Sequence, residues 1–140
     1  MLQKTKDTLD LICNDKLFEE YDIRFVGGTA LSYIINHRLS EDLDFAALEL
    51  NIKDIKKMMT SYGAEKLPHD PTMSDYVANE GEDIDTLYMK FMLNDVKIEF
   101  FTPPFNMMEL SVWKNDKYTK YNNSNIRIAS LQTIIYMKTM

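Results

Sequence analysis

The chain combines segments whose hydrophobic residues recur at helical spacing with segments that are rich in β-branched and aromatic residues. Helical spacing covers residues 2–20 and 51–62 and returns from residue 131 onward, which predicts a helix in each place. Asn51 and Ser130 stand where a capping side chain accepts a backbone N–H, and Gly63 stands just beyond the second helix. These boundaries support the second and third predicted helices.

Strand-like runs alternate with these helices. They cover residues 23–26, 86–93, 96–101 and 126–129. Asn94 and Asp95 separate the second run from the third, and two such residues are typical of a tight hairpin turn. We therefore expect an antiparallel hairpin in the second half of the chain.

The segment between the second helix and the hairpin has a different character. Residues 64–85 contain Pro68, Pro71 and Gly81 among many acidic residues, which predicts an irregular excursion with one short strand. Within this segment we expect Asp83 and Asp85 to form an exposed acidic loop.

Two glycines follow the first strand-like run. Gly27 and Gly28 precede Thr29 and a further helical pattern. Glycines allow a tight turn and the close approach of a ligand to the main chain. Thr29 is in the position of an N-cap hydroxyl, and backbone N–H groups at a helix N-terminus attract anions. Gly27, Gly28 and Thr29 are therefore a candidate triphosphate site.

A pair of carboxylates follows at helix length. Asp42 and Asp44 are two residues apart in a strand-like stretch and should share one face. Adjacent carboxylates repel each other unless a cation neutralises them, and hard oxygen ligands suit Mg²⁺ or Mn²⁺. Glu99 is the candidate third ligand, because a charge in so apolar a strand needs a partner. Lys97 shares its face, either paired with a carboxylate or in contact with a phosphate.

This order of features resembles the DNA polymerase β-like nucleotidyltransferase superfamily. More narrowly, residues 25–31 and 37–45 resemble the AbiEii family, which contains toxins of type IV toxin–antitoxin systems. The match is close over residues 23–45 and looser over residues 97–101. The resemblance implies an α/β (α+β) polymerase β-like fold, with a small mixed sheet and helices packed chiefly on one face. It also implies an NTP substrate, Mg²⁺ or Mn²⁺, a tRNA or protein acceptor and a cognate antitoxin.

Three further residues belong to the predicted nucleotide site, two of them through the resemblance. Lys138 matches a lysine that family members carry on a helix after a strand. Arg38 is placed near the site by the resemblance, although a cation there also suits a helix C-terminus. Ser40 either contacts a phosphate, supports Asp42 or acts as a turn residue.

In the implied reaction a nucleoside monophosphate passes from the NTP to an acceptor hydroxyl, and pyrophosphate leaves. Asp42 and Asp44 hold two metal ions, Glu99 ligates the second and can act as base, and the glycine turn holds the β- and γ-phosphates. Family members continue with further helices, whereas this sequence stops at Met140, so we expect the C-terminal helical part to be lacking. The alternative is a catalytically inert nucleotide-binding or protein-interaction module, which exposed apolar surface on the last helix would favour.

Composition narrows the class of protein. A chain of 140 residues with 45% hydrophobic residues is expected to form a single domain around one core. The lone cysteine, Cys13, excludes an internal disulfide framework and agrees with a reducing compartment. The chain shows neither a secretory signal pattern nor an apolar run of membrane-spanning length, so we expect a cytoplasmic protein without a membrane partner.

The formal net charge of −6 disfavours a general affinity for nucleic acids. Residues 113–127 depart from this balance, because they carry four basic residues and one acidic residue, with Trp113, Tyr118 and Tyr121 interleaved. Such a mixture can bind single-stranded nucleic acid through stacking and phosphate contacts. A solvated loop with an edge strand is the favoured interpretation.

Overall fold

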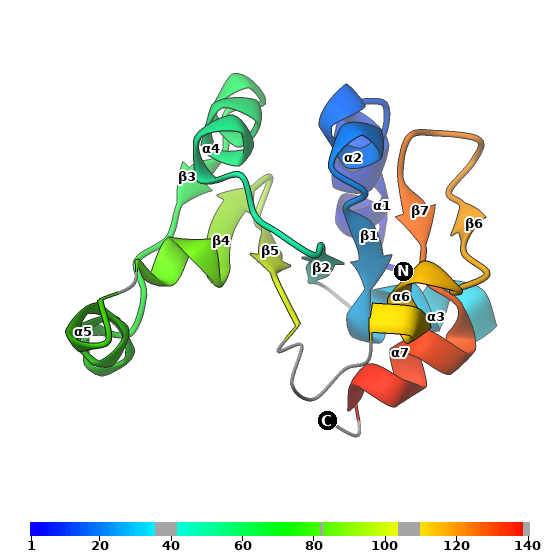
Figure 1. Ribbon diagram of the computed structural model, residues 1–140. Coiled ribbons are helices and arrows are strands. Elements are labelled where there is room, and N and C mark those ends of the chain that lie inside the picture. The colour runs from blue at the N-terminus through cyan, green and yellow to red at the C-terminus, as the bar shows by residue number, and fades with distance from the viewer. Residues whose placement is uncertain (36–41, 82, 104–109, 139–140) are drawn as a thin grey trace.

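The computed structural model describes residues 1–35, 42–81, 83–103 and 110–138. In these residues, seven strands form one sheet in the order β3-β4-β5-β2-β1-β7-β6 (Figure 1). The strands are β1 (Arg24–Val26), β2 (Leu43–Ala46), β3 (Glu65–Lys66), β4 (Tyr88–Leu93), β5 (Val96–Phe101), β6 (Thr119–Lys120) and β7 (Arg127–Ile128). β1 is parallel to β7 and antiparallel to β2, while β2 is parallel to β5. The predicted mixed sheet is confirmed.

The described residues also form helices, which precede, separate and follow the strands along the sequence. They are α1 (Gln3–Ile12), α2 (Lys16–Glu20), α3 (Gly27–Ile35), α4 (Ile52–Ser61), α5 (Pro71–Asn79), α6 (Leu110–Lys114) and α7 (Leu131–Lys138). A short 3₁₀ helix, η1, spans Ile84–Thr86. Figure 1 shows α3, α6 and α7 gathered at the lower right, with α1 and α2 above them, and α4 at the upper left above β3 and β4. Among the described residues, no helix has both the length and the apolar character needed to cross a lipid bilayer.

Aromatic rings form the centre of the core. Burial alternates along β4 and β5, so that one face of this hairpin is buried and the other is partly exposed. On the buried face the rings of Phe45 and Phe100 stack with centroids 5.4 Å apart, and Phe18 of α2 lies 5.0 Å from Phe45. Because α2 covers this face, the opposite face of β4, β5 and β2 is left for polar side chains. We call it the polar face; it carries Tyr88, Lys90, Lys97, Glu99 and Asp44.

Three local predictions are confirmed, two by hydrogen bonds and one by backbone conformation. The Asn51 side chain accepts the N–H of Asp54 at 3.0 Å and caps α4. The Thr133 N–H donates to Ser130 Oγ at 3.3 Å at the start of α7. Between β4 and β5, Asn94 and Asp95 have φ of 53° and 61°, as the left-handed residues of a tight hairpin turn require.

The single helix predicted over residues 2–20 is wrong. The chain leaves α1 after Ile12 and starts again at α2, where the Asp15 carboxylate accepts the N–H of Leu17 at 3.1 Å. Aspartate competes well for backbone N–H groups outside helices, so it favours a cap over a helix interior. Hydrophobic spacing did not reveal the break, because the apolar stripe continues across it.

The irregular excursion predicted over residues 64–85 contains a helix, α5, in addition to the expected short strand. Pro71 is its first residue, a position where a missing N–H costs no hydrogen bond. The Asp70 carboxylate accepts the N–H groups of Thr72 and Met73 at 2.8 and 3.3 Å. Proline and aspartate, taken from the sequence as loop signals, are here the start signals of a helix.

The predicted exposure of the acidic loop is wrong at Asp85, which is only 6% exposed. Its carboxylate is surrounded by His69 Nε2 at 2.6 Å, Lys56 Nζ at 2.8 Å and Lys66 Nζ at 3.2 Å. Burial alone would raise the pKa of Asp85, but the hydrogen bonds from Lys56, His69 and Lys66 outweigh it and lower the pKa to about 2. The cluster ties α4, β3 and the loop at His69 to η1.

We expect Asp85→Asn to lower the free energy of unfolding by roughly 1–3 kcal/mol at neutral pH. The value is moderate because the Lys56 and Lys66 side chains are 41% and 31% exposed and therefore partly screened. Since the folded pKa of about 2 lies below the ordinary 3.8, this contribution is present above about pH 4 and disappears as the pH falls through 2. Urea unfolding at several pH values measures it.

The matched control for this experiment is Asp75→Asn, which removes an exposed carboxylate from α5. It should change the stability by less than about 0.5 kcal/mol. An equal loss in both variants, or a loss for Asp85→Asn that persists unchanged at about pH 2, would contradict the role of the cluster.

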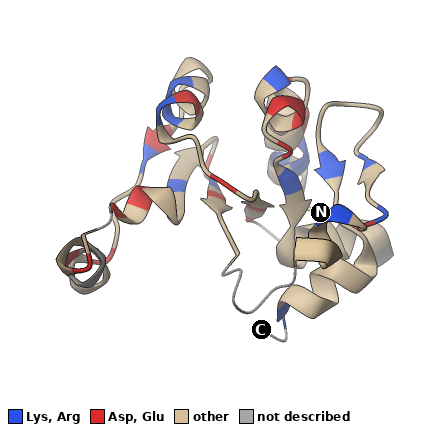
Figure 2. Cartoon of the chain, viewed as in Figure 1, with Lys and Arg blue, Asp and Glu red and all other residues tan. Residues whose placement is uncertain are grey.

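The aromatic residues of the basic stretch at residues 113–127 are mainly core residues. Trp113 and Tyr121 are 1% and 0% exposed, so they cannot stack on nucleic-acid bases. The Arg24 guanidinium lies 4.3 Å from the Trp113 ring, and Arg127 lies 5.2 Å from the ring of Tyr118. Figure 2 shows basic positions on β7 and on β6, the latter at the edge of the sheet. The loop with an edge strand is the interpretation that the structure supports.

Candidate functional site

The glycine turn lies next to the carboxylates because of strand pairing. β1 ends at Val26, and the chain turns at Gly27 directly into α3. Val26 lies opposite Asp44 in the antiparallel pair β1 and β2, and Asp44 lies beside Glu99 in the parallel pair β2 and β5. Three segments that are distant in the sequence therefore meet on the polar face.

Gly27 is in direct contact with Asp44. Its φ of +79° is in the left-handed region, which side-chain-bearing residues rarely adopt. A Cβ atom at this position would lie 2.9 Å from the Cβ of Asp44 and closer still to its carboxylate. The turn thus needs glycine for its backbone conformation and for the space that the Asp44 side chain fills. Gly28 is the second residue of α3 and is half-buried.

Hydrogen bonds and ion pairs connect the polar side chains around Asp44. A hydrogen bond joins the carboxyl groups of Asp44 and Glu99, and the Tyr88 hydroxyl donates to Glu99. The Lys97 Nζ lies 3.2 Å from Glu99 Oε1 and 3.5 Å from Asp42 Oδ2. Of the three predicted carboxylates, two are therefore in contact, and the ammonium group of Lys97 links the third to them.

This arrangement shifts the pKa values of four groups. The hydrogen bond to Glu99 and the charges of Glu99 and Asp42 raise the pKa of Lys97. Burial, together with the nearby Glu99 and Asp42, raises the pKa of Asp44 to about 7. Burial also acts against the ionised form of Glu99, but hydrogen bonds from Tyr88, Lys97 and Asp44 outweigh it and lower the pKa of Glu99. Burial and the hydrogen bond to Glu99 raise the pKa of the Tyr88 hydroxyl. Of this pair, Asp44 is therefore the carboxyl group that takes up a proton more readily, and Glu99 is the one that ionises more readily.

Thr29 has a different position from the one predicted. It is the third residue of α3 and not its N-cap, because the left-handed turn at Gly27 lets the helix begin three residues earlier, at Gly27 and not at Ala30. Its side chain is 1% exposed, and its hydroxyl donates to the backbone carbonyl of Asp42. Thr29 thereby ties α3 to the residue that precedes β2. Its predicted contact with phosphate stays a prediction.

Three predicted residues are not brought to this site by the described structure. Arg38 and Ser40 lie outside the described residues. Lys138 is the last residue of α7 and is exposed, and within the described part of the chain no ion pair joins it to the three carboxylates. The nucleotide-binding roles of these residues stay predictions.

The donor set suits a hard divalent cation. Carboxylate oxygens are the ligands that Mg²⁺ and Mn²⁺ prefer, and burial together with the charges of Glu99 and Asp42 makes ionised Asp44 unfavourable without a nearby cation. Within the described ranges, however, no three His, Cys, Asp or Glu side chains stand close enough together to hold a metal ion. Lys97 supplies the positive charge between Asp42 and Glu99 instead. Metal binding by Asp42, Asp44 and Glu99 therefore stays a prediction.

Tyr88 is the residue that the sequence analysis missed. Its hydroxyl bonds to Glu99, and its ring lies 6.0 Å from that of His69. The register of the hairpin was a usable signal. A two-residue turn at Asn94 and Asp95 places Lys90 opposite Glu99, and Tyr88 is two residues from Lys90 on the same face.

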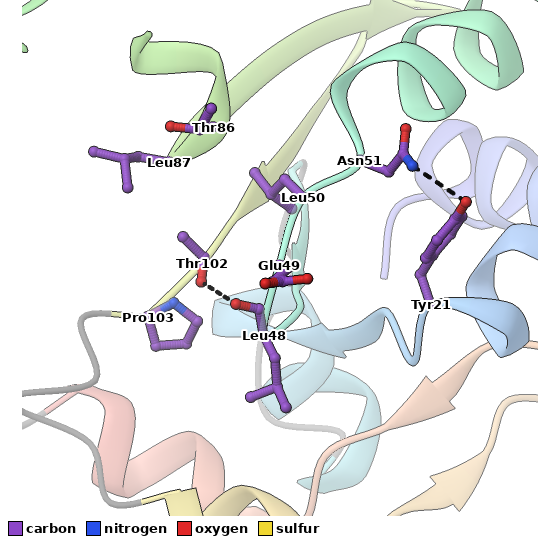
Figure 3. Close-up of a pocket in the computed structure, with 9 residues that line it drawn as sticks. All are labelled: Tyr21, Leu48, Glu49, Leu50, Asn51, Thr86, Leu87, Thr102 and Pro103. Atoms are coloured by element: carbon purple, nitrogen blue, oxygen red, sulfur yellow. Dashed lines mark hydrogen bonds between the residues drawn. The ribbon is translucent and has the colours of Figure 1, made fainter. Parts of the chain in front are cut away.

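A separate cavity of about 740 Å³ opens beyond the ends of β2 and β5 (Figure 3). Thr102 Oγ1 donates to the carbonyl of Leu48 at 2.9 Å, and Asn51 Nδ2 donates to the Tyr21 hydroxyl at 3.2 Å. Glu49 is the charged residue among its lining side chains. The residues that line this cavity include neither the glycine turn nor any of the three carboxylates, so we place the candidate site on the polar face instead.

Comparison with known proteins places this geometry in a family. The chain is similar to a tRNA-processing enzyme in an apo form, with a TM-score of 0.52 and 14% identity, covering 99% of this chain and 36% of that one. It also matches a tRNA nucleotidyltransferase complexed with a primer tRNA and an incoming ATP analog, with a TM-score of 0.48 and 16% identity, covering 88% and 36%. A search of the curated proteins finds no match.

At these identities the first likeness shows a shared fold, and this chain spans 36% of the length of both structures. The family comparison is more specific. The family described as "Nucleotidyl transferase AbiEii toxin, Type IV TA system" matches residues 10–140, which include the glycine turn and all three carboxylates. The resemblance seen in the sequence is thus confirmed, and the chain belongs to the AbiEii nucleotidyl transferase family.

Proposed function

We propose that this chain transfers a nucleoside monophosphate group from an NTP to an acceptor hydroxyl, in a reaction that depends on a divalent metal ion. The observation that carries the proposal is the contact between Asp44 and Glu99 on the polar face, directly beside the Gly27 turn. An anion-binding helix start and a carboxylate pair are the two elements that nucleotidyl transfer needs.

The glycine turn binds the triphosphate in this proposal. α3 starts at Gly27, so the backbone N–H groups of its first turn and the positive end of the helix dipole are available to the β- and γ-phosphates. The absence of side chains at Gly27 and Gly28 lets the phosphates approach the main chain. Because Asp44 contacts Gly27, the α-phosphorus is held beside the carboxylates.

Asp42, Asp44 and Glu99 hold the metal and orient the acceptor. When bound, a divalent ion neutralises triphosphate charge and lowers the pKa of the acceptor hydroxyl. Glu99 is kept ionised by Tyr88 and Lys97, so it can accept the proton of that hydroxyl. Thr29 fixes the backbone at Asp42 and thereby the position of its carboxylate.

The comparisons support the proposed acceptor and the proposed biological role. The tRNA-processing enzyme that shares the fold makes tRNA the first acceptor to test, and a protein hydroxyl is the second. Membership of a type IV toxin–antitoxin family supports a toxic modification in the cytoplasm, with a cognate antitoxin as partner.

The test is label transfer from each α-labelled NTP to a tRNA pool and to a protein pool, with Mg²⁺, Mn²⁺ or a chelator. We expect incorporation that needs the metal and that falls by roughly 10²-fold or more in Glu99→Gln. Incorporation that persists in the chelator would contradict the metal requirement, and incorporation unaffected by Glu99→Gln would contradict the site.

A non-catalytic binding module is the second candidate. Leu131 and Ile135, one turn apart on α7, are 37% and 49% exposed, which is the apolar surface that this alternative predicts. Binding of an NTP with Mg²⁺ but without transfer to either acceptor pool would favour the module.

A further inference from the structure

Lys97 occupies the middle of the carboxylate group. It projects from β5 on the same face as Glu99, two residues along the strand, and reaches both Glu99 and Asp42. Its nitrogen is 3.2 Å from one carboxylate and 3.5 Å from the other, so one ammonium group serves two predicted metal ligands. The pairing joins β5 to the residue that precedes β2.

A divalent ion and this ammonium group cannot share that position. An ion held by Asp42 and Glu99 would lie within a few ångströms of the Lys97 nitrogen, and two cations at such a distance repel each other strongly. Each carboxylate oxygen that accepts from the ammonium group is also withdrawn from metal coordination. Among the described residues, no three His, Cys, Asp or Glu side chains are close enough together to hold a metal ion. This agrees with Lys97 occupying the position that the metal ion would take.

The two ion pairs of Lys97, with Asp42 and with Glu99, form a bridge that is exposed enough to be displaced. The side chains of Asp42 and Lys97 are 46% and 37% exposed, while that of Glu99 is 19% exposed. Ion pairs with this exposure contribute little stability each, so a divalent ion that binds several carboxylates can compete with them. A lysine ammonium group is a compact charge on a flexible stem and can move away without a backbone change.

We propose that Lys97 is a built-in counter-cation of the site, which bridges Asp42 and Glu99 in the absence of metal and must be displaced for a divalent ion to bind. Lys97 thereby sets the metal affinity of the site as a positioning residue. This inference rests on the proposed function only in taking Asp42 and Glu99 as metal ligands. It concerns binding, so it is measured without NTP or acceptor.

The experiment is Mn²⁺ binding to the whole chain by titration calorimetry or by electron paramagnetic resonance of free Mn²⁺. Because the competing charge is removed, Lys97→Gln is expected to bind Mn²⁺ roughly three- to tenfold more tightly than wild type. Lys97→Thr, with a β-branched side chain that suits a strand, serves as a second neutral variant. Lys97→Arg keeps the charge and should keep the wild-type affinity.

Lys90→Gln is the matched control. Lys90 lies opposite Glu99 in the hairpin register, but in the described part of the chain it makes no ion pair with Asp42 or Glu99. Its removal lowers the local positive potential without breaking the bridge, so the affinity should change by less than about twofold. Thermal unfolding gives a second readout: added Mn²⁺ should raise the Tm of Lys97→Gln more than that of wild type.

The outcomes separate this inference from the proposed function. Equal Mn²⁺ affinity in Lys97→Gln, Lys97→Thr and wild type, or an equal gain in Lys90→Gln, overturns the counter-cation role even if the wild type transfers nucleotides. Tighter binding confined to the neutral Lys97 variants supports it even if no transfer is found. If neither wild type nor the neutral variants bind Mn²⁺, the inference is overturned.

Discussion

The substitution Asp44→Asn is expected to reduce nucleotidyl transfer by roughly 10³-fold or more while leaving the chain folded. Asp44 is the central carboxylate: it is in contact with Gly27, hydrogen-bonded to Glu99 and close enough to Asp42 to feel its charge. An amide keeps the shape of the side chain but can no longer carry the negative charge that a metal ion needs. Label transfer under the conditions that give wild-type activity measures the loss.

The stability of the same variant separates a chemical effect from a structural one. Burial and the neighbouring carboxylates disfavour the ionised form of Asp44, so a neutral amide of similar shape should not lower the free energy of unfolding. Urea unfolding of Asp44→Asn in the absence of metal should therefore match or exceed that of wild type. Transfer activity of Asp44→Asn above about a tenth of the wild-type activity would show that Asp44 is not a catalytic residue.

Gly27→Ala is expected to destabilise the fold by roughly 2–4 kcal/mol and to abolish transfer. Alanine is strained at a φ of +79°, and its Cβ would overlap the side chain of Asp44. Because Asp44 is held by Glu99 on one side, it can move away only by leaving the carboxylate group. Chemical denaturation and the label-transfer assay measure the two effects.

Gly63→Ala is a matched control for Gly27→Ala. Gly63 has a similar φ of +88°, but a Cβ there would meet nothing within 4 Å. It should therefore show the backbone strain alone, roughly 1 kcal/mol, with transfer unchanged. Equal losses in the free energy of unfolding for the two substitutions would mean that the close approach of Gly27 and Asp44 adds nothing to the cost of a Cβ at position 27.

Local signals in the sequence predicted those elements that their own side chains define. Asn51 caps α4, Asn94 and Asp95 form the hairpin turn, and Ser130 starts α7, as expected. The same signals were misleading where a residue type is common both in loops and at the start of a helix. Asp15 breaks a helix that the apolar pattern runs through, and Pro71 begins a helix where a loop was expected.

The candidate site was predictable in its parts but not in its connections. The glycine turn and the carboxylates stood out because their residue types suit phosphate and metal. Tyr88 did not stand out, since a tyrosine in a strand is ordinary and only the hairpin register brings it to Glu99. The bridging role of Lys97 depends on Asp42, which lies far away in the sequence. Whether a charged side chain is paired depends on its neighbours on adjacent strands. The pattern of residues along the sequence does not show these neighbours.

The sequence by itself determined the family, the order of helices and strands around the motif, and the residue types that can bind phosphate and metal. These properties depend on local spacing and on side-chain chemistry. Only the tertiary structure decided that Asp44 contacts Gly27, that it lies beside Glu99, and that Lys97 stands between Glu99 and Asp42. Those contacts arise from the register of β1 against β2 and of β2 against β5, which the packing of the whole sheet sets.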